Sequence, residues 1–452
     1  MRKQERVDPM IKKSAIALLS GTLLLMAACS NGSGGQGQTG NSAKPEDKKE
    51  AAVNKEPVEL VFYDGVSDYT EERFMKEIGE PIKKKFPHVT PKFSPFTKLT
   101  QVQDLISAGQ APDIIFASSG LFNDVVNKYN MQTDIMPLIQ KYKYDLNKID
   151  PVSVDMMKEI SKGGMYALPT LMSPSPIYYN KDIFDKFGVP YPKDDMKWDD
   201  LYELAKKVTR KDGNQQYYGF MVSFQHLMVR NQFSLNLVDP ATETTSFADE
   251  KWNKMTANIS RFYELDGVEP NAQKLGAAQQ RVMFTKEKTL AMWMPVSTLL
   301  TGQELEGMNW DMAQFPEFKE LPGVGPQPYP ISFYITTTNK HKDQSFEVIA
   351  YLASEEYQLP MVKQGQFPTA LTSPALRSSF GQDTAMYKGK NVKAMLPAKY
   401  AKASAFTKFN NLSRNQLQAA LEANVLQKKD MNTALREAAE RANAAIKAEK
   451  AK

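Results

Sequence analysis

The sequence has 452 residues, of which 42% are hydrophobic and 24% charged. This balance is typical of a globular protein, and the length predicts two or more lobes rather than one core. The net charge of +5 includes no sustained basic stripe, which argues against nucleic acid as a partner. The single cysteine excludes an intrachain disulfide. The three histidines are too dispersed for a metal motif, so we expect no metal and no other cofactor.

The N-terminal segment, residues 1–28, has the pattern of a secretory signal. A basic pair precedes an apolar run at residues 15–28, which is shorter than the about 18 residues expected of a membrane-spanning helix. Residues 29–56 are rich in small and polar side chains, so they are predicted to form a flexible linker. A G-x-G-x-x-G match at residues 32–37 follows no predicted strand, so we assign it no nucleotide-binding role.

The ordered body is predicted to begin near Pro57 with alternating strands and helices. Apolar periodicity predicts strands at Val58 to Asp64, around Val89 to Phe93 and at Asp113 to Ala117, with helices between them. Pro81 falls within the first of these helices and is expected to break or restart it. This alternation is typical of a parallel sheet that is covered by helices.

The second half of the body repeats this pattern less regularly. Strands are predicted within residues 165–184, 288–297 and 329–338, and helices within residues 198–209, 345–357 and 430–447. The last of these helices carries alanines at spacings of three and four. We therefore expect it to pack onto the body despite its charged face.

The stretch Leu25-Met26-Ala27-Ala28-Cys29 resembles a bacterial lipobox, with Met26 in the position usually held by leucine. The resemblance implies that Cys29 carries a lipid such as palmitate and becomes the first residue of the mature chain. The alternative is an ordinary signal peptide with an incidental cysteine. The expectation is an extracytoplasmic lipoprotein that is anchored to the bacterial cell membrane.

Six later segments, in this order, resemble the extracellular solute-binding proteins of ABC importers, in the group that includes maltose-type sugar binders. They are GQAPDIIFASSG (109–120), YALPTLMSPSPIYYNKDIFDKFGV (166–189), WDDLYELAKKVT (198–209), FTKEKTLAMW (284–293), VKQGQFPT (362–369) and ALREAAERANAAI (434–446). Glu287 replaces the glycine that is usual in the fourth segment. Each segment alone is weak evidence for the family, but the shared order of the segments behind a lipobox and a linker is specific to it.

The resemblance implies an α/β fold of the type II periplasmic-binding-protein class, in which two α/β lobes with a hinge and a ligand cleft between them close on a ligand. We expect one lobe at residues 57–170 and 324–373, and the other at residues 171–323 and 374–452. The implied role is to capture a carbohydrate, expected to be an oligosaccharide, and to deliver it to ABC permease subunits.

Two alternatives to this role stay open. The same fold can bind a peptide, a polyamine or another polar solute. A lipid-anchored glycoside hydrolase would need a fixed pair of carboxylates, which no segment supplies. We therefore expect a binding protein with no catalytic residue and no enzyme activity.

Ligands of open α/β sheets bind beyond the carboxyl ends of the strands, which directs attention to the residues there. Asp64 is expected to contact ligand, with a turn or helix-cap role as the alternative. By the resemblance, Trp293 is the best candidate for stacking on a sugar ring. The other candidates for the ligand site are Tyr63, Ser118, Ser119, Gln225, His226, Arg230, Tyr329, Phe406 and Phe409.

Each of these candidates has a structural alternative. An aromatic residue is more often part of a core, and this is the favoured role for Phe406 and Phe409. A serine at position 118 or 119 can cap a helix. His226 can be a hydrogen-bonded structural residue, and Arg230 is a surface charge unless the ligand is acidic.

Overall fold

The computed structural model describes residues 55–66, 69–96, 102–297, 300 and 302–451. The predicted signal, the lipobox with Cys29 and nearly all of the linker lie outside these described residues. Within them, no helix is both long and apolar enough to cross a bilayer.

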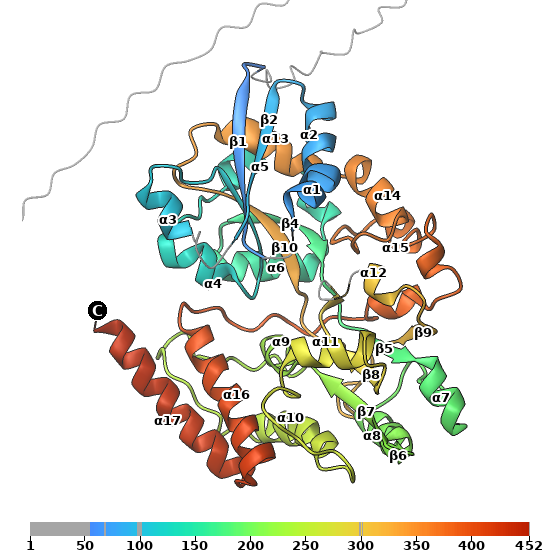
Figure 1. Cartoon of the computed structure of the whole chain (residues 1–452). Helices are drawn as coiled ribbons and strands as arrows, with labels where there is room; N and C mark the ends of the chain where they lie inside the picture. Colours follow the sequence, from blue (N-terminus) through green and yellow to red (C-terminus); the bar gives the residue numbers. More distant parts are fainter. Residues whose placement is uncertain (1–54, 67–68, 97–101, 298–299, 301, 452) are drawn as a thin grey trace, which may run out of the picture. The chain divides into compact units, whose positions relative to one another are not determined.

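The first sheet has five strands in the order β2-β1-β3-β10-β4 (Figure 1). Its strands are β1 (Val58–Asp64), β2 (Val89–Ser94), β3 (Ile114–Ser118), β4 (Ala167–Met172) and β10 (Pro330–Ile335). The predicted strands are confirmed, and β1 is parallel to β2 and β3. The sheet as a whole is mixed, because β10 runs antiparallel to both β3 and β4.

The helices that accompany this sheet come from two parts of the chain, residues 71–160 and residues 342–378. They are α1 (Glu71–Phe74), α2 (Glu80–Lys85), α3 (Val102–Ser107), α4 (Phe122–Val125), α5 (Met136–Lys141), α6 (Pro151–Ile160), α13 (Lys342–Leu352), α14 (Glu355–Lys363) and α15 (Pro374–Ser378). The single helix predicted within residues 345–357 is two helices. Ser354 separates them, and its side chain accepts a hydrogen bond from the Tyr357 N–H at the start of α14.

A π-helical turn, Met75–Gly79, joins α1 to α2. Pro81 follows in the first turn of α2, so the helix restarts at the proline as predicted. The carbonyl of Glu77, four residues earlier, cannot accept a hydrogen bond from a proline nitrogen. It accepts one from the Tyr357 hydroxyl at 2.9 Å instead, so this buried backbone group stays paired.

The second sheet has five strands in the order β6-β7-β8-β5-β9. Its strands are β5 (Ile177–Asn180), β6 (Arg210–Asp212), β7 (Gln215–Val222), β8 (Leu290–Met294) and β9 (Trp310–Ala313). Strands β7 and β8 are parallel, and the other pairs are antiparallel. The accompanying helices are α7 (Lys181–Phe187), α8 (Trp198–Val208), α9 (Phe224–Val229), α10 (Glu250–Ser260), α11 (Ala277–Thr285), α12 (Gly302–Leu305), α16 (Asn410–Gln427) and α17 (Met431–Lys450).

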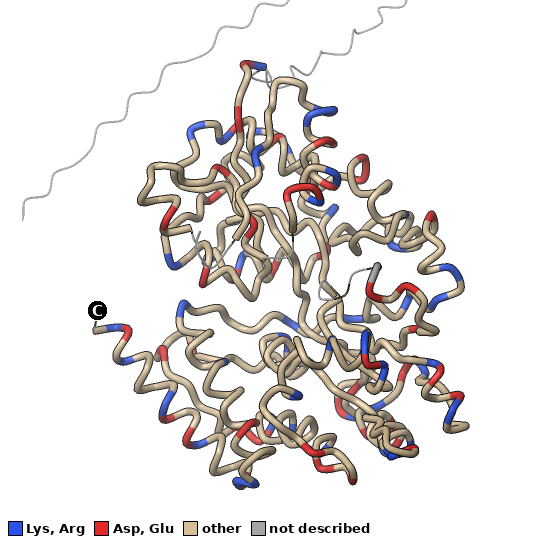
Figure 2. Tube along the Cα trace, in the orientation of Figure 1, with Lys and Arg blue, Asp and Glu red and all other residues tan. Residues whose placement is uncertain are grey.

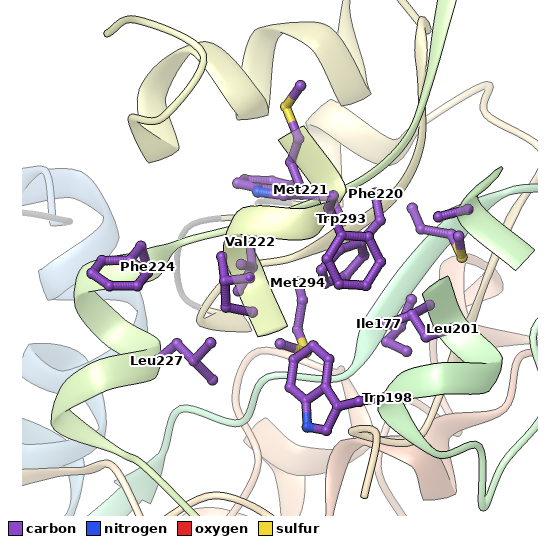
Figure 3. Packing of buried hydrophobic residues seen from close by; sticks show 14 of the residues in the cluster. Ile177, Trp198, Leu201, Phe220, Met221, Val222, Phe224, Leu227, Trp293 and Met294 are labelled. Atoms are coloured by element: carbon purple, nitrogen blue, oxygen red, sulfur yellow. The ribbon is translucent and has the colours of Figure 1, made fainter. Parts of the chain in front are cut away.

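Each sheet has its own large hydrophobic core. In the core of the second sheet, Trp198 of α8 and Trp293 of β8 lie on either side of Met294 and Val222 (Figure 3). Gly219 lets β7 approach α8 closely, because a Cβ atom there would lie 2.2 Å from the carbonyl oxygen of Ala205. The predicted packing of the C-terminal helix is confirmed, since α17 buries an apolar stripe against the body.

Positive and negative side chains are interspersed along the described chain (Figure 2). Many of them form ion pairs at exposed positions, such as Lys85 with Glu356 at 2.7 Å. Exposed pairs of this kind contribute about 0–1 kcal/mol each, so the two hydrophobic cores supply most of the stability.

Candidate ligand-binding site

Two connections run between the sheets and are hydrogen-bonded to each other. Residues 173–176 join β4 to β5, and residues 314–329 join β9 to β10. The Ser173 N–H donates to the carbonyl oxygen of Tyr329 at 3.0 Å. A third segment, residues 397–405, lies alongside the second connection, because the Gly325 N–H donates to the Lys399 carbonyl at 2.8 Å. Three chain segments therefore meet between the sheets.

Tyr329 lies at this meeting point and contacts the last residue of β3 in the first sheet and two residues on and directly after α9, which follows β7 of the second sheet. Ser118, the last residue of β3, donates from Oγ to the Tyr329 hydroxyl at 3.3 Å. The Tyr329 and His226 rings meet edge-on, with their centroids 5.9 Å apart. The Arg230 guanidinium lies 5.3 Å from the centroid of the Tyr329 ring. We call Ser118, His226, Arg230 and Tyr329 the Tyr329 cluster.

The local chain path explains how α9 brings two of these residues to Tyr329. Strand β7 ends at Val222, and the Ser223 N–H donates to the carbonyl of Met294 at the end of β8 at 3.3 Å. Helix α9 begins directly after Ser223, whose Oγ lies 2.6 Å from His226 Nδ1. The carboxyl ends of β3 and β7, one strand from each sheet, therefore lead into the Tyr329 cluster, and ligands of α/β proteins bind at such strand ends.

Arg230 is buried, with 3% of its surface exposed. Its Nη1 donates to Ser175 Oγ at 2.6 Å, and its Nε donates to the Gln327 carbonyl at 3.2 Å. Its Nη2 is buried and has no hydrogen-bond partner in the described part of the chain. Burial in a medium of low polarity lowers the pKa of Arg230 to about 10, so it still carries its charge at neutral pH.

Gln327 links the second connection to the third segment and to the chain that follows α9. Its Nε2 donates to the Asn231 carbonyl at 2.9 Å, and its Oε1 accepts from the Ser404 N–H at 2.8 Å. Sequence reasoning missed both Gln327 and Ser175. One available signal was their setting, because each is a polar residue between two prolines in a segment that joins apolar strands.

Three candidates near the ends of β1 and β3 lie outside the Tyr329 cluster. Asp64 is 1% exposed, and its two carboxylate oxygens accept from the N–H groups of Val66 and Tyr69 at 2.9 and 3.0 Å. It therefore holds a turn instead of facing a ligand. Tyr63 is part of the first core. Ser119 is buried beside Ser118, and neither caps α4, whose N-cap residue is Leu121.

Two aromatic candidates also lie in cores. Trp293 lies in the core that Figure 3 shows. It is 0% exposed, and its indole N–H donates to Gln280 Oε1 at 3.0 Å. Neither face of its ring is open to a sugar, so the predicted stacking role is wrong for this structure. Phe409 packs against Val238 and Ile446 and has the core role that was favoured for it.

The remaining two candidates lie near the cluster without joining it. Gln225 is exposed on α9, one residue before His226. Phe406 is half-buried and packs against the core of the first sheet, although it follows a segment that is hydrogen-bonded to the second connection. In the described ranges, no group of three His, Cys, Asp or Glu residues could hold a metal.

His226 provides a test of the buried, positively charged character of the cluster. Burial, then the positive charges of Arg230 and Arg414, lower its pKa from 6.5 to about 4. The unfolded chain therefore binds a proton more readily, and stability falls as the pH drops from 6.5 towards 4. Urea unfolding measures the free energy of unfolding at each pH. Between pH 6.5 and 4, we expect this free energy to fall less in His226→Gln than in the wild type. Equal losses in the two proteins would contradict a buried neutral His226.

The comparisons with known proteins identify the family to which the chain belongs. A family model described as bacterial extracellular solute-binding protein matches residues 67–359, and the chain belongs to this family. The sn-glycerol-3-phosphate-binding periplasmic protein of Brucella melitensis is 26% identical over 333 residues, which is 68% of this chain and 73% of that protein. An uncharacterized ABC transporter extracellular-binding protein of Pyrococcus horikoshii is 25% identical over 206 residues. That alignment spans 44% of each chain, less than half of the relative's length.

Solved structures confirm the predicted type II binding-protein fold. The ABC substrate-binding protein of Listeria monocytogenes in complex with cycloalternan has a TM-score of 0.73 at 16% identity. The superposition covers 86% of this chain and 99% of that one. At this level of identity, the similarity shows only that the two proteins share a fold.

Proposed function

We propose that the protein captures a carbohydrate outside the cytoplasm, by closure of two lobes, and delivers it to an ABC permease. The Tyr329 cluster is the observation that carries this proposal. It combines an aromatic ring, which is 7% exposed in this structure, with serine and arginine groups that suit hydroxyls. The cluster lies where residues from both sheets meet, so a ligand bound there would hold the two sheets together.

Two of the similar proteins support a polar, hydroxyl-bearing ligand. The Listeria protein is described in complex with cycloalternan, and the Brucella relative is named for sn-glycerol-3-phosphate. A buried arginine also disfavours a polyamine, because two positive charges would repel each other in a site of low polarity. An oligosaccharide is therefore the ligand that we infer.

A thermal-shift screen over oligosaccharides, peptides and polyamines tests this function. A ligand that binds the native state raises the melting temperature by mass action. We expect a rise with at least one oligosaccharide and none with the polyamines. A rise only with peptides would contradict the carbohydrate proposal. Release of product from any glycan of the panel would contradict a role in binding without catalysis.

We also propose that the lobes comprise residues 57–170 with 324–373 and residues 171–323 with 374–452. The strands of the two sheets support this division, although α15 (Pro374–Ser378) packs Leu376 into the core of the first sheet. Four strands of the first sheet lie within the first set of residues, and β4 extends two residues beyond residue 170. All five strands of the second sheet lie within residues 171–323.

We further propose that Cys29 carries the lipid that anchors the protein to the membrane. In bacterial cells, the Cys29→Ser protein is expected to move from the membrane fraction to the soluble fraction, because it lacks the thiol that is acylated. Its affinity for the carbohydrate should not change, since Cys29 precedes the described body. Ser30→Ala is the matched control and should stay in the membrane fraction. A Cys29→Ser protein that remains membrane-bound would contradict the anchor.

A further inference from the structure

The Tyr329 cluster contains a buried cation without a counter-charge. No ion pair of Arg230 occurs within the described ranges, and its hydrogen-bond acceptors are a serine hydroxyl and a backbone carbonyl. Burying a charge without a partner of opposite charge is costly, and buried charges in proteins are normally paired. The unpartnered Nη2 of Arg230 adds a second cost, since a buried donor is left without an acceptor.

Other unpartnered polar groups lie around Arg230. The Tyr400 hydroxyl is buried without a hydrogen-bond partner in the described chain, and Tyr400 and Arg230 interact electrostatically. On α16, which packs against α9, Asn411 Nδ2 and Arg414 Nε are also buried and unpartnered. Each of these four atoms can donate a hydrogen bond, and three of them can only donate.

Asp150, the carboxylate that interacts with Tyr400, already has two other partners. Asp150 pairs with Arg377 at 2.8 Å and accepts from the Val152 N–H at 3.1 Å at the start of α6. It therefore does not neutralise Arg230. A cavity of about 10 Å³, roughly the space of one water molecule, is lined by Arg230, His226 and Ser175, so an anionic group would reach Arg230 only after movement of the surrounding side chains.

We propose that the carbohydrate bound by this protein carries an anionic group, a carboxylate or a phosphate, which accepts hydrogen bonds from Arg230 Nη2 and the Tyr400 hydroxyl. The inference rests on the proposed function, because it names the class of carbohydrate for the same site. An anion would supply both the missing counter-charge and the missing acceptors, whereas a neutral hydroxyl supplies only an acceptor. Arg414 would add a second positive charge near His226, on which it acts electrostatically.

Calorimetric titration with matched charged and neutral sugars tests this inference. The probes are trigalacturonate against its methyl ester, and glucose 6-phosphate against methyl glucoside. We expect a charged member to bind about 10- to 100-fold more tightly than its neutral partner, the range of hydrogen bonds to a charged group. Preference in the first pair identifies a carboxylate, and preference in the second pair identifies a phosphate.

Three variants keep the test decisive. Arg230→Gln should reduce the affinity for the charged sugar to about the affinity for the neutral sugar. Tyr400→Phe removes only an unpartnered hydroxyl, so it should fold normally and weaken binding of the charged sugar alone. Arg436→Gln, at an exposed position on α17, is the matched control and should change neither affinity.

The outcomes separate this inference from the proposed function. Equal binding of the charged and neutral members, with equal effects of the variants on both, would overturn the anionic class and leave carbohydrate capture intact. Binding of neither member of either pair, together with no carbohydrate response in the thermal-shift screen, would overturn the proposed function itself.

Discussion

Replacement of Trp293 by alanine is expected to lower the free energy of unfolding by about 3–5 kcal/mol, the usual cost of removing a large aromatic side chain from a core. Trp293 is fully buried in β8, packs against Phe284 and donates to Gln280. The variant also leaves the buried Gln280 acceptor without this partner. Because the ring does not reach the Tyr329 cluster, the affinity of the folded variant for its carbohydrate should not change.

Urea unfolding followed by circular dichroism measures the stability change, and calorimetry below the unfolding transition measures the affinity. Trp293→Phe keeps most of the apolar volume and should cost less than the alanine variant. A Trp293→Ala protein of nearly normal stability that no longer binds carbohydrate would contradict the core assignment. It would restore the stacking role that the sequence predicts.

Replacement of Tyr329 by alanine is expected to weaken carbohydrate binding by about 10- to 100-fold, the equivalent of about 1.4–2.7 kcal/mol. The variant removes a ring that contacts both His226 and Arg230 and a hydroxyl that accepts from Ser118. These contacts come from the end of β3 and from residues on and directly after α9, which follows β7, so their loss should affect closure as well as direct contact with the sugar.

The probe for this prediction is the oligosaccharide that gives the largest thermal shift with the wild type, and the measurement is calorimetric. Tyr329→Phe retains the ring and should lose less affinity than Tyr329→Ala. Tyr351→Ala, on α13 in the first core region, is a matched control that should bind normally. Unchanged affinity of Tyr329→Ala would place the ligand site elsewhere.

Much of the fold was predictable from local sequence patterns. The strands β1, β2 and β3 were predicted within a few residues, because apolar periodicity and flanking turn residues are local signals. The antiparallel position of β10 between β3 and β4 was not, since it depends on a pairing between residues more than 150 positions apart. One helix predicted within residues 345–357 is two helices in the structure. Ser354 explains this difference, because its side chain caps the start of α14 within a single apolar pattern.

The candidate site was only partly predictable. Ser118, His226, Arg230 and Tyr329 were on the predicted list, and the structure brings them together. The predictions that Trp293 and Asp64 contact the ligand differ from the structure for the same reason. Residues in or at the end of a buried strand can face either the core or the strand's carboxyl edge, and sequence alone does not distinguish these directions. Gln327 was missed because its role depends on three segments that meet only in the folded chain.

A distance measurement between the two sheets tests the central claim, capture of a carbohydrate by lobe closure. Cys29 is the only cysteine, so a Cys29→Ser protein can carry spin labels at two new cysteines, Lys92→Cys on β2 and Lys211→Cys on β6. Both positions are exposed. The account predicts that a stabilising oligosaccharide shifts the distance distribution measured by double electron–electron resonance towards one narrower population. Saturating oligosaccharide that leaves the distribution unchanged would contradict it.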